Sequence, residues 1–247
     1  MSLSGKHAVV TGGGTGVGAD VARALAEAGA KVTIMGRSEA PLKAQGLPYQ
    51  LCDVTDAGAV QAAFAAARAD QGPVGIMVAN AGAADSVPFA KMTPEQLTAM
   101  LSVNLVGVSN CWQAALPDMK AAGWGRMIAI ASTAGLKGYP YVSAYCAAKH
   151  GVVGLTRALS LELARTGITV NAICPGFIET PLLERSIENI VATTGMSAEQ
   201  AEKSLKSGNP QKRFIQTDEV AGAALWLCSQ AARSVNGHAL SLSGGEI

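Results

Sequence analysis

A tyrosine and a lysine stand at a spacing that suits proton-transfer chemistry. Tyr145 and Lys149 are four positions apart in an Ala-rich stretch, so a helix would bring both side chains to one face. Neither Tyr139 nor Tyr141 has a lysine four residues further on. A phenol with a pKa of ~10 transfers protons poorly at neutral pH, but a nearby ammonium favours the phenolate and lowers that pKa. We expect Tyr145 to be an acid/base group tuned by Lys149, although such a pair alone is also typical of an ordinary helix surface.

Two further polar residues extend this set. Ser132 follows the β-branched run 127–131, and a hydroxyl at that place would hydrogen-bond an oxygen on which negative charge develops. Asn104 stands in an otherwise apolar helical stretch and is a candidate for ordering a water behind Lys149; the alternative is a buried amide satisfied by backbone. The four residues together predict proton transfer to a carbonyl that accepts a hydride.

A glycine-rich loop predicts a nucleotide site. It lies between the first β-branched run, 7–10, and a helical pattern that ends near residue 28. Glycines let backbone N–H groups approach a pyrophosphate, and the helix N-terminus adds partial positive charge. A glycine string alone is a weak signal, but this position makes it a strong one. The residues expected at the nucleotide are Gly12, Thr15, Gly16, Val17 and Gly18.

The end of the second predicted strand indicates which dinucleotide binds. An acidic residue there usually accepts from a ribose 2′-hydroxyl, whereas an arginine suits a 2′-phosphate. This chain has Gly36 at the acidic position, followed by Arg37. A guanidinium pairs with phosphate through two hydrogen bonds. The sequence therefore favours NADP(H) over NAD(H); the alternative is an exposed loop arginine.

Three more loops follow predicted strands and complete the expected cofactor site. An acid after the third strand would accept from an adenine amino group, small residues after the fourth would let a flat ligand approach, and a Pro-Gly turn after the sixth would orient a carboxamide. Ordinary turns and helix caps are the alternatives. The residues concerned are Asp53, Val54, Asn80, Ala81, Gly82, Pro175, Gly176, Ile178 and Thr180.

The elements that must position these residues alternate between strand and helix. Strands are predicted at 7–10, 31–35, 49–52, 74–78, 127–131, 169–174 and 239–242, with Ala-rich helical stretches between them. This alternation is typical of a doubly wound (Rossmann) α/β fold, a parallel sheet with helices on both faces. With no break in composition, we expect one domain spanning 1–247. The polar, helix-prone segment 182–212 is an expected insertion that covers the site.

Composition excludes several classes of protein. The chain has 247 residues and a formal net charge of +1, which argues against a nucleic-acid partner. Residues 96–117 carry no charge, but Asn104, Asn110 and Gln113 make a membrane span unfavourable, so we expect a buried helix at the core or at a subunit contact. The five cysteines show no CxxC spacing, and no cluster has metal-ligand spacing. Without a signal-peptide pattern, a cytoplasmic location is expected.

These residues together resemble the short-chain dehydrogenase/reductase family, in its single-domain branch, over essentially the whole chain. The resemblance implies a seven-stranded sheet, a nicotinamide cofactor, hydride transfer with Tyr145 as acid/base and a homotetramer. One departure is Ala79, where the family commonly has an asparagine before its NAG motif. The matching positions are Thr11, Gly12, Gly16 and Gly18 for TGxxxGxG, 80–82 for NAG, Tyr145 and Lys149 for YxxxK, Pro175, Gly176 and Thr180 for PGxxxT, with Ser132 and Asn104 as the family serine and asparagine.

Within the family, residues 146–181 look like bacterial polyketide ketoreductases and 3-oxoacyl thioester reductases, and also like D-3-hydroxybutyrate dehydrogenases. The latter hold a small carboxylate with polar residues near the active serine and tyrosine. Here Ala134, Gly135 and Val142 occupy that region, and Lys137 is the nearby cation. We expect an NADP(H)-dependent reductase of a 3-oxoacyl thioester. The alternative is an NAD-dependent secondary-alcohol or 3-hydroxybutyrate-type dehydrogenase, and a remote one is a non-catalytic nucleotide sensor, which would be expected to lack the tyrosine or the lysine.

Overall fold

Seven parallel strands form one sheet in the order β3-β2-β1-β4-β5-β6-β7 in the computed structural model, which describes residues 2–247. The predicted doubly wound fold is therefore confirmed. The chain passes from β3 across to β4, so the strand order reverses beside β1, and ligands bind at such a reversal in folds of this kind. The strands are β1 (His7–Thr11), β2 (Lys31–Gly36), β3 (Tyr49–Leu51), β4 (Val74–Ala79), β5 (Gly125–Ile130), β6 (Ile168–Pro175) and β7 (Ala239–Leu242).

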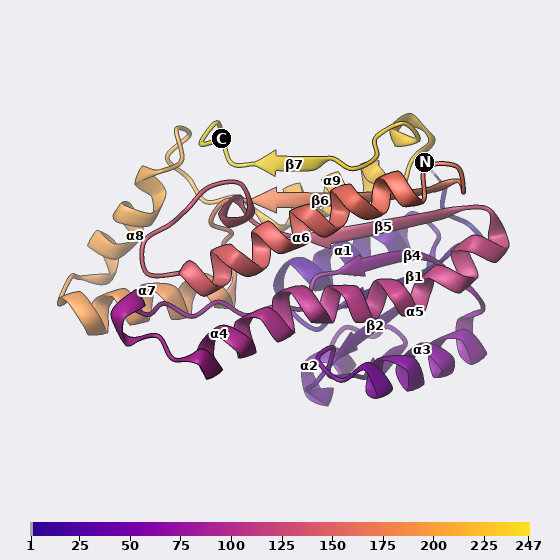
Figure 1. Ribbon diagram of the computed structural model, residues 1–247, viewed down its shortest axis with the longest axis horizontal. Coiled ribbons are helices and arrows are strands. Elements are labelled where there is room, and N and C mark those ends of the chain that lie inside the picture. Colours follow the sequence, from indigo (N-terminus) through magenta and orange to yellow (C-terminus); the bar gives the residue numbers. More distant parts are fainter. Residues whose placement is uncertain (1) are drawn as a thin grey trace.

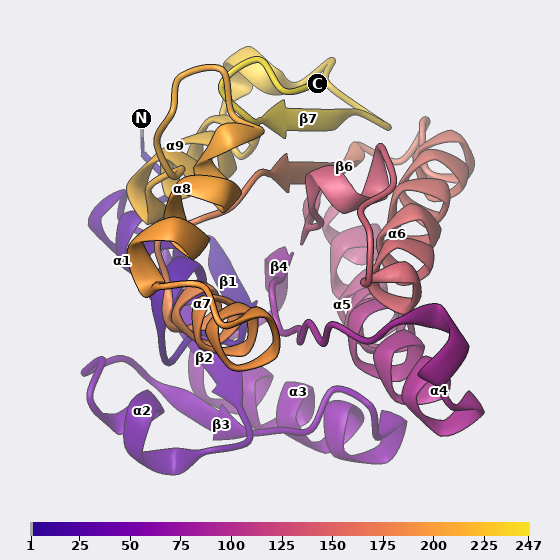
Figure 2. The ribbon, with the colours of Figure 1, turned by 90° about the vertical axis from the view of Figure 1, so that its left-hand side faces the viewer.

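Helices cover both faces of this sheet (Figure 1, Figure 2). Because side chains alternate along a strand, Val9 of β1 packs into the core beneath α3, α5 and α6, whereas its neighbour Val10 packs beneath α1 and α9. The helices are α1 (Gly16–Glu27), α2 (Glu39–Lys43), α3 (Ala57–Gln71), α4 (Pro94–Leu101), α5 (Gly107–Ala122), α6 (Ser143–Glu162), α7 (Pro181–Thr194), α8 (Ala198–Ser207) and α9 (Thr217–Leu227). No helix among residues 2–247 is long and apolar enough to cross a membrane.

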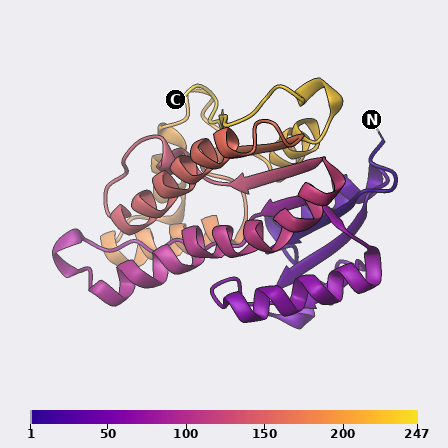
Figure 3. The same ribbon diagram turned by 45° about the vertical axis from the view of Figure 1, so that its right-hand side comes forward.

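The helix expected from the uncharged stretch 96–117 is interrupted. A π-helical turn, η2 (Ser102–Val106), joins α4 to α5 and has Asn104 at its centre. Figure 3 shows α5 and α6 running beside each other over one face of the sheet. Period-3.6 patterning does not reveal a single wider turn, because the apolar positions on either side keep their spacing.

The segment 182–212 forms helices and no strand. It makes up most of α7 and all of α8, and α8 begins at a capping box in which Ser197 and Gln200 exchange side-chain hydrogen bonds with each other's backbone. The side chain of residue 182 lies outside the described part of the chain. Both helices lie beyond the carboxyl ends of β6 and β7, toward which the strand arrows point in Figure 1. The fold therefore brings the segment to the sheet edge that carries the candidate residues.

Candidate active site

The serine, tyrosine and lysine come together from two elements. Ser132 follows β5, and Tyr145 and Lys149 lie on consecutive turns of α6. The Lys149 Nζ is 5.5 Å from the centroid of the Tyr145 ring and donates a hydrogen bond to the Ile130 carbonyl oxygen at 2.9 Å. The Lys149 side chain is buried, whereas Tyr145 and Ser132 are each partly exposed. A substrate oxygen reaching this edge would therefore meet the two hydroxyls before the ammonium.

Burial, rather than the lysine, governs the acidity of the tyrosine in this structure. Desolvation raises the pKa of Tyr145 to about 12, while the neighbouring Ser132 hydroxyl acts in the opposite direction. Desolvation also lowers the pKa of Lys149 to about 8. The expectation that the ammonium makes the phenol more acidic is therefore not met by the protein alone. At neutral pH Tyr145 keeps its proton and is equipped to donate it.

Asn104 is fully buried and bonded to backbone groups. Its amide nitrogen donates to the carbonyl oxygens of Ala83 at 2.9 Å and Met100 at 3.1 Å, and its amide oxygen accepts from the Ala83 N–H at 3.3 Å. Gly82 leaves room for it, because a Cβ there would lie 2.7 Å from the Asn104 Oδ1. The structure thus places Asn104 as the support of the loop after β4, which is the alternative that the sequence left open; the water-ordering role stays a prediction.

The glycine loop fits a pyrophosphate. Gly12 and Gly16 have positive φ values of 64° and 51°, and a Cβ on Gly18 would lie 2.3 Å from the Gly12 carbonyl oxygen. Thr15, at the N-cap of α1, makes no capping bond through its side chain, and the first turn, which includes Val17, has no acidic residue. The N–H groups at this helix N-terminus are therefore available to an anion.

The turn after β4 holds that loop in place. The Asn80 side chain donates to the carbonyl oxygens of Thr11 at 3.0 Å and Gly12 at 3.3 Å. The Thr11 Oγ1 in turn accepts from the backbone N–H groups of Asn80 and Ala81, each at 3.1 Å. The sequence pointed to Asn80 and Ala81 as cofactor contacts, whereas in the structure they form hydrogen bonds with Thr11 and Gly12. Thr11 is thus a supporting residue that only its place in the TG motif could have signalled.

Arg37 and Asp53 lie together at the other end of the candidate cofactor site. Arg37 is exposed directly after β2. Hydrogen bonds from the Thr55 backbone and hydroxyl lower the pKa of Asp53, and the positive charge of Arg37 lowers it further. The neighbouring Val54 is buried and its carbonyl oxygen accepts from Asn110 at 2.9 Å. One carboxylate oxygen of Asp53 is therefore engaged locally by Thr55. Asp53 does not cap the next helix, because the N-cap of α3 is Asp56.

The loop after β6 connects the glycine loop to the far end of the insertion. Ile178 pairs with Ile215 in a short parallel bridge, and the Ile215 N–H donates to the Phe177 carbonyl oxygen at 2.9 Å. The Thr180 Cγ2 is 3.4 Å from where a Cβ on Gly16 would lie, so Thr180 lies against the glycine loop. Pro175 ends β6, and the nearest neighbours of Gly176 belong to the last residues of the chain, Leu242, Ser243 and Glu246. Residues 2–247 contain no group of three or more side chains arranged to hold a metal ion.

Comparison with known proteins agrees with this geometry. The family model described as short chain dehydrogenase matches residues 6–191. The chain is 38% identical to D-beta-hydroxybutyrate dehydrogenase of Cupriavidus necator, covering 98% of both chains. It is 39% identical to granaticin polyketide synthase putative ketoacyl reductase 1 of Streptomyces violaceoruber, covering 96% of this chain and 92% of that one. A crystal structure of an actinorhodin polyketide ketoreductase variant with NADPH matches with a TM-score of 0.94 and 36% identity, covering 100% of this chain and 99% of that one.

The buried ammonium yields a stability prediction. Because burial lowers the pKa of Lys149 from 10.5 to about 8, the charged form destabilises the fold by about 3 kcal/mol at pH 7. Lys149→Met removes that cost but leaves the Ile130 carbonyl without its donor, a loss of about 1 kcal/mol. We expect the variant to be more stable than the wild type by about 2 kcal/mol in urea unfolding at pH 7.

The pH dependence provides the check. The destabilisation is fully present below pH 8 and is relieved as the pH rises from about 8 toward 10.5, so the advantage of the variant should shrink over that interval. A Lys149→Met protein that unfolds more easily than the wild type at pH 7 would contradict this account.

Proposed function

The chain belongs to the short-chain dehydrogenase/reductase family, and we propose that it reduces the ketone of a 3-oxoacyl thioester, or a similar neutral ketone, with NADP(H). The proposal is carried by one observation: Ser132 lies near the Tyr145–Lys149 pair, at the same edge of the sheet as the glycine loop. The similarity to a ketoacyl reductase over nearly the full chain supports the choice of substrate.

Three residues have separate roles in the reduction of the ketone. The Ser132 hydroxyl donates a hydrogen bond to the carbonyl oxygen, which strengthens as negative charge develops there. Tyr145 gives its phenolic proton to that oxygen. The Lys149 ammonium, 5.5 Å from the ring, stabilises the phenolate that is left. When bound, a nicotinamide supplies the hydride to the carbonyl carbon.

The protonation of Tyr145 favours the reductive direction. With a pKa of about 12 in the protein alone, the phenol is a ready donor at neutral pH, whereas alcohol oxidation needs it as the phenolate. The positive charge of an oxidised nicotinamide would favour that phenolate. We therefore assign ketone reduction to neutral pH and the reverse reaction to more alkaline conditions.

Arg37 supports NADP(H) as the cofactor. It is exposed and forms no ion pair within 4 Å in the described part of the chain. It also follows Gly36, at the position where an acidic residue would repel a 2′-phosphate. The structural relative described above was solved with NADPH. Asp53, beside Arg37, is proposed to accept from the adenine amino group with its free carboxylate oxygen.

A second candidate is a 3-hydroxybutyrate-type dehydrogenase that uses NAD. It is favoured by the 38% identity to a protein of that name. The apolar residues Ala134 and Val142 disfavour it, because they offer a small carboxylate no hydrogen bond. A non-catalytic nucleotide sensor is the remote third candidate, and the presence of both Tyr145 and Lys149 argues against it.

We also propose a homotetramer in a reducing, cytoplasmic setting. A mostly apolar groove lies between the η2–α5 junction and α6, and Val106 in it is 45% exposed. The residues that line it are Leu105, Val106, Ser109, Gly151, Gly154, Leu155 and Ala158. Such a face suits burial against a second copy. All five cysteines are free and buried, as expected for a reducing compartment. The segment 182–212 is proposed to cover the substrate at the carboxyl ends of the strands.

A substrate screen tests the proposed function. The absorbance of reduced nicotinamide is followed with both cofactors against acetoacetyl thioesters, cyclic ketones and aryl alcohols. We expect the highest kcat/KM for the acetoacetyl thioester with NADPH. Activity confined to secondary alcohols with NAD would instead support the second candidate.

Arg37→Ala tests the cofactor preference. Loss of a charge-assisted, two-pronged hydrogen bond worth about 2 kcal/mol should raise the KM for NADPH about thirtyfold and leave that for NADH within about threefold. Arg23→Ala is the matched control, because Arg23 is an exposed arginine of α1 paired with Asp20. Equal losses for both cofactors would remove the basis for preferring NADPH.

Tyr145→Phe tests the proton donor. Removing one oxygen should lower kcat by about 10²–10⁴-fold, while the dissociation constant for NADPH, measured by fluorescence, stays within about twofold. Tyr141→Phe, at an exposed position nearby, is the control. A Tyr145→Phe enzyme that retains substantial turnover would assign the proton transfer to another group.

A further inference from the structure

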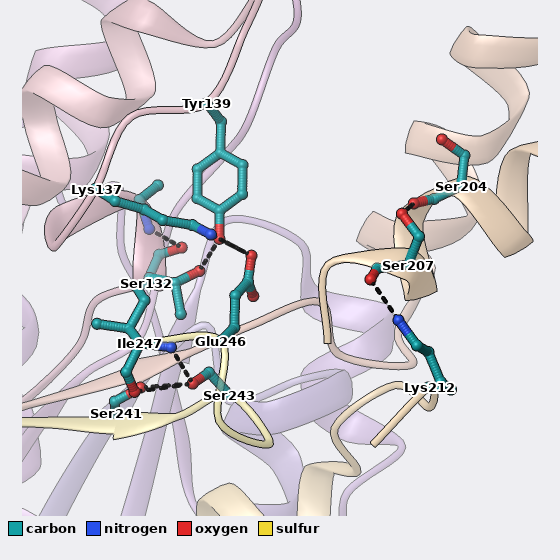
Figure 4. A network of polar contacts seen from close by, with 12 residues as sticks. Ser132, Lys137, Tyr139, Ser204, Ser207, Lys212, Ser241, Ser243, Glu246 and Ile247 are labelled. Atoms are coloured by element: carbon teal, nitrogen blue, oxygen red, sulfur yellow. Dashed lines mark hydrogen bonds and ion pairs between the residues drawn. The ribbon is translucent and has the colours of Figure 1, made fainter. Parts of the chain in front are cut away.

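A glutamate near the end of the chain closes onto the loop between Ser132 and Tyr145. The Glu246 Oε1 lies 2.6 Å from the Lys137 Nζ and accepts a hydrogen bond from the Tyr139 hydroxyl at 2.8 Å (Figure 4). Its side chain is only 7% exposed, and that of Lys137 is 38% exposed. The pair is therefore sheltered on the carboxylate side and open to solvent on the ammonium side.

This contact is connected to the loop that carries Ser132. The Tyr139 hydroxyl that meets Glu246 is also 2.7 Å from the Oγ1 of Thr133, the residue after Ser132. The Tyr139 ring packs edge-on against Phe177, with ring centroids 6.2 Å apart, in the loop after β6. Glu246 therefore lies where the loops after β5 and β6 meet.

The tail that carries Glu246 is held tightly. Gly244 has a φ of 63°, and a Cβ there would lie 2.1 Å from the Asn209 Oδ1. The Ser243 Oγ accepts from the Ile247 N–H at 3.2 Å and is bonded to the Ser241 Oγ at 2.9 Å, as seen in Figure 4. The carboxylate is consequently fixed by both its backbone and its partners, and is not a freely moving surface group.

Lys137 is the one cation in the sequence between Ser132 and Tyr145. A substrate with a free carboxylate needs a cation or several hydrogen-bond donors at this rim, and Ala134 and Val142 provide no donor side chain. Glu246 already neutralises the charge of Lys137. A substrate carboxylate would therefore gain no ion pair there and would be repelled by the fixed carboxylate of Glu246. An ester or thioester of the same acid meets neither penalty.

We propose that Glu246 is a specificity-determining residue that makes the site reject 3-oxo acids with a free carboxylate and accept their neutral acyl derivatives. The inference rests on the proposed function. It narrows the substrates of the proposed ketone reduction to uncharged acyl derivatives. It assigns Lys137 and Glu246 to substrate selection and leaves the proton transfer to Tyr145.

The test compares acetoacetate with its methyl ester, which differ at the carboxyl group by one charge and one methyl. The measured quantity is the ratio of kcat/KM for the ester to that for the acid at pH 7 with NADPH. We expect a ratio well above one in the wild type and a decrease of about tenfold or more in Glu246→Gln, because the amide releases Lys137 to the substrate carboxylate. In Glu246→Gln with Lys137→Met this gain for the acid should disappear.

The control is Asp20→Asn, which removes a carboxylate from an exposed ion pair with Arg23 on α1 and should leave the ratio unchanged. A purely structural role for Glu246 would lower kcat/KM for both substrates alike, and an unchanged ratio would overturn the proposal. A wild-type enzyme that reduces acetoacetate as efficiently as its ester would overturn it without any variant. An enzyme that reduces neither acetoacetate, nor its ester, nor any other ketone of the screen would instead overturn the proposed function.

Discussion

The burial of one ammonium beneath one phenol is the constraint on which the site depends. Lys149 is removed from water with a single carbonyl acceptor, from Ile130. Desolvation lowers the pKa of Lys149. The Tyr145 phenol is desolvated as well, which raises its pKa and keeps it protonated at neutral pH. The fold thus tolerates an unfavourable charge in order to hold it below the reacting oxygen, as expected when a site is organised for a transition state and not for stability.

The sequence predicted most of what positions this pair. Short, continuous runs of β-branched residues located all the strands to within about two residues, since a fully buried parallel strand must be apolar on both faces. The i,i+4 spacing predicted the shared face of Tyr145 and Lys149 correctly. The π-helical turn at Asn104 and the short helix α2 were not predicted, because neither changes the hydrophobic period of its surroundings.

The parts that sequence reasoning missed are contacts between segments distant along the chain. Asn80 bonds to the glycine loop from 68 residues away, and Glu246 bonds to Tyr139 from 107 residues away. Neither contact leaves a periodic signal, and both depend on the order of strands in the sheet. The acidity of Tyr145 was misjudged for a related reason, because the extent of burial follows from packing and cannot be counted from spacing.

The bridge between Ile178 and Ile215 has a consequence for how such a protein diversifies. Since these two residues are paired in a bridge beyond the end of β6, the segment that carries α7 and α8 begins and ends at one point outside the seven strands. The residues between Ile178 and Ile215 belong to no strand, so replacing them leaves the hydrogen bonds of the sheet intact. A segment of different length would change the entropic cost of loop closure only slightly. Related proteins can therefore differ in the helices that cover the substrate while the strands, and the residues that follow them, stay the same.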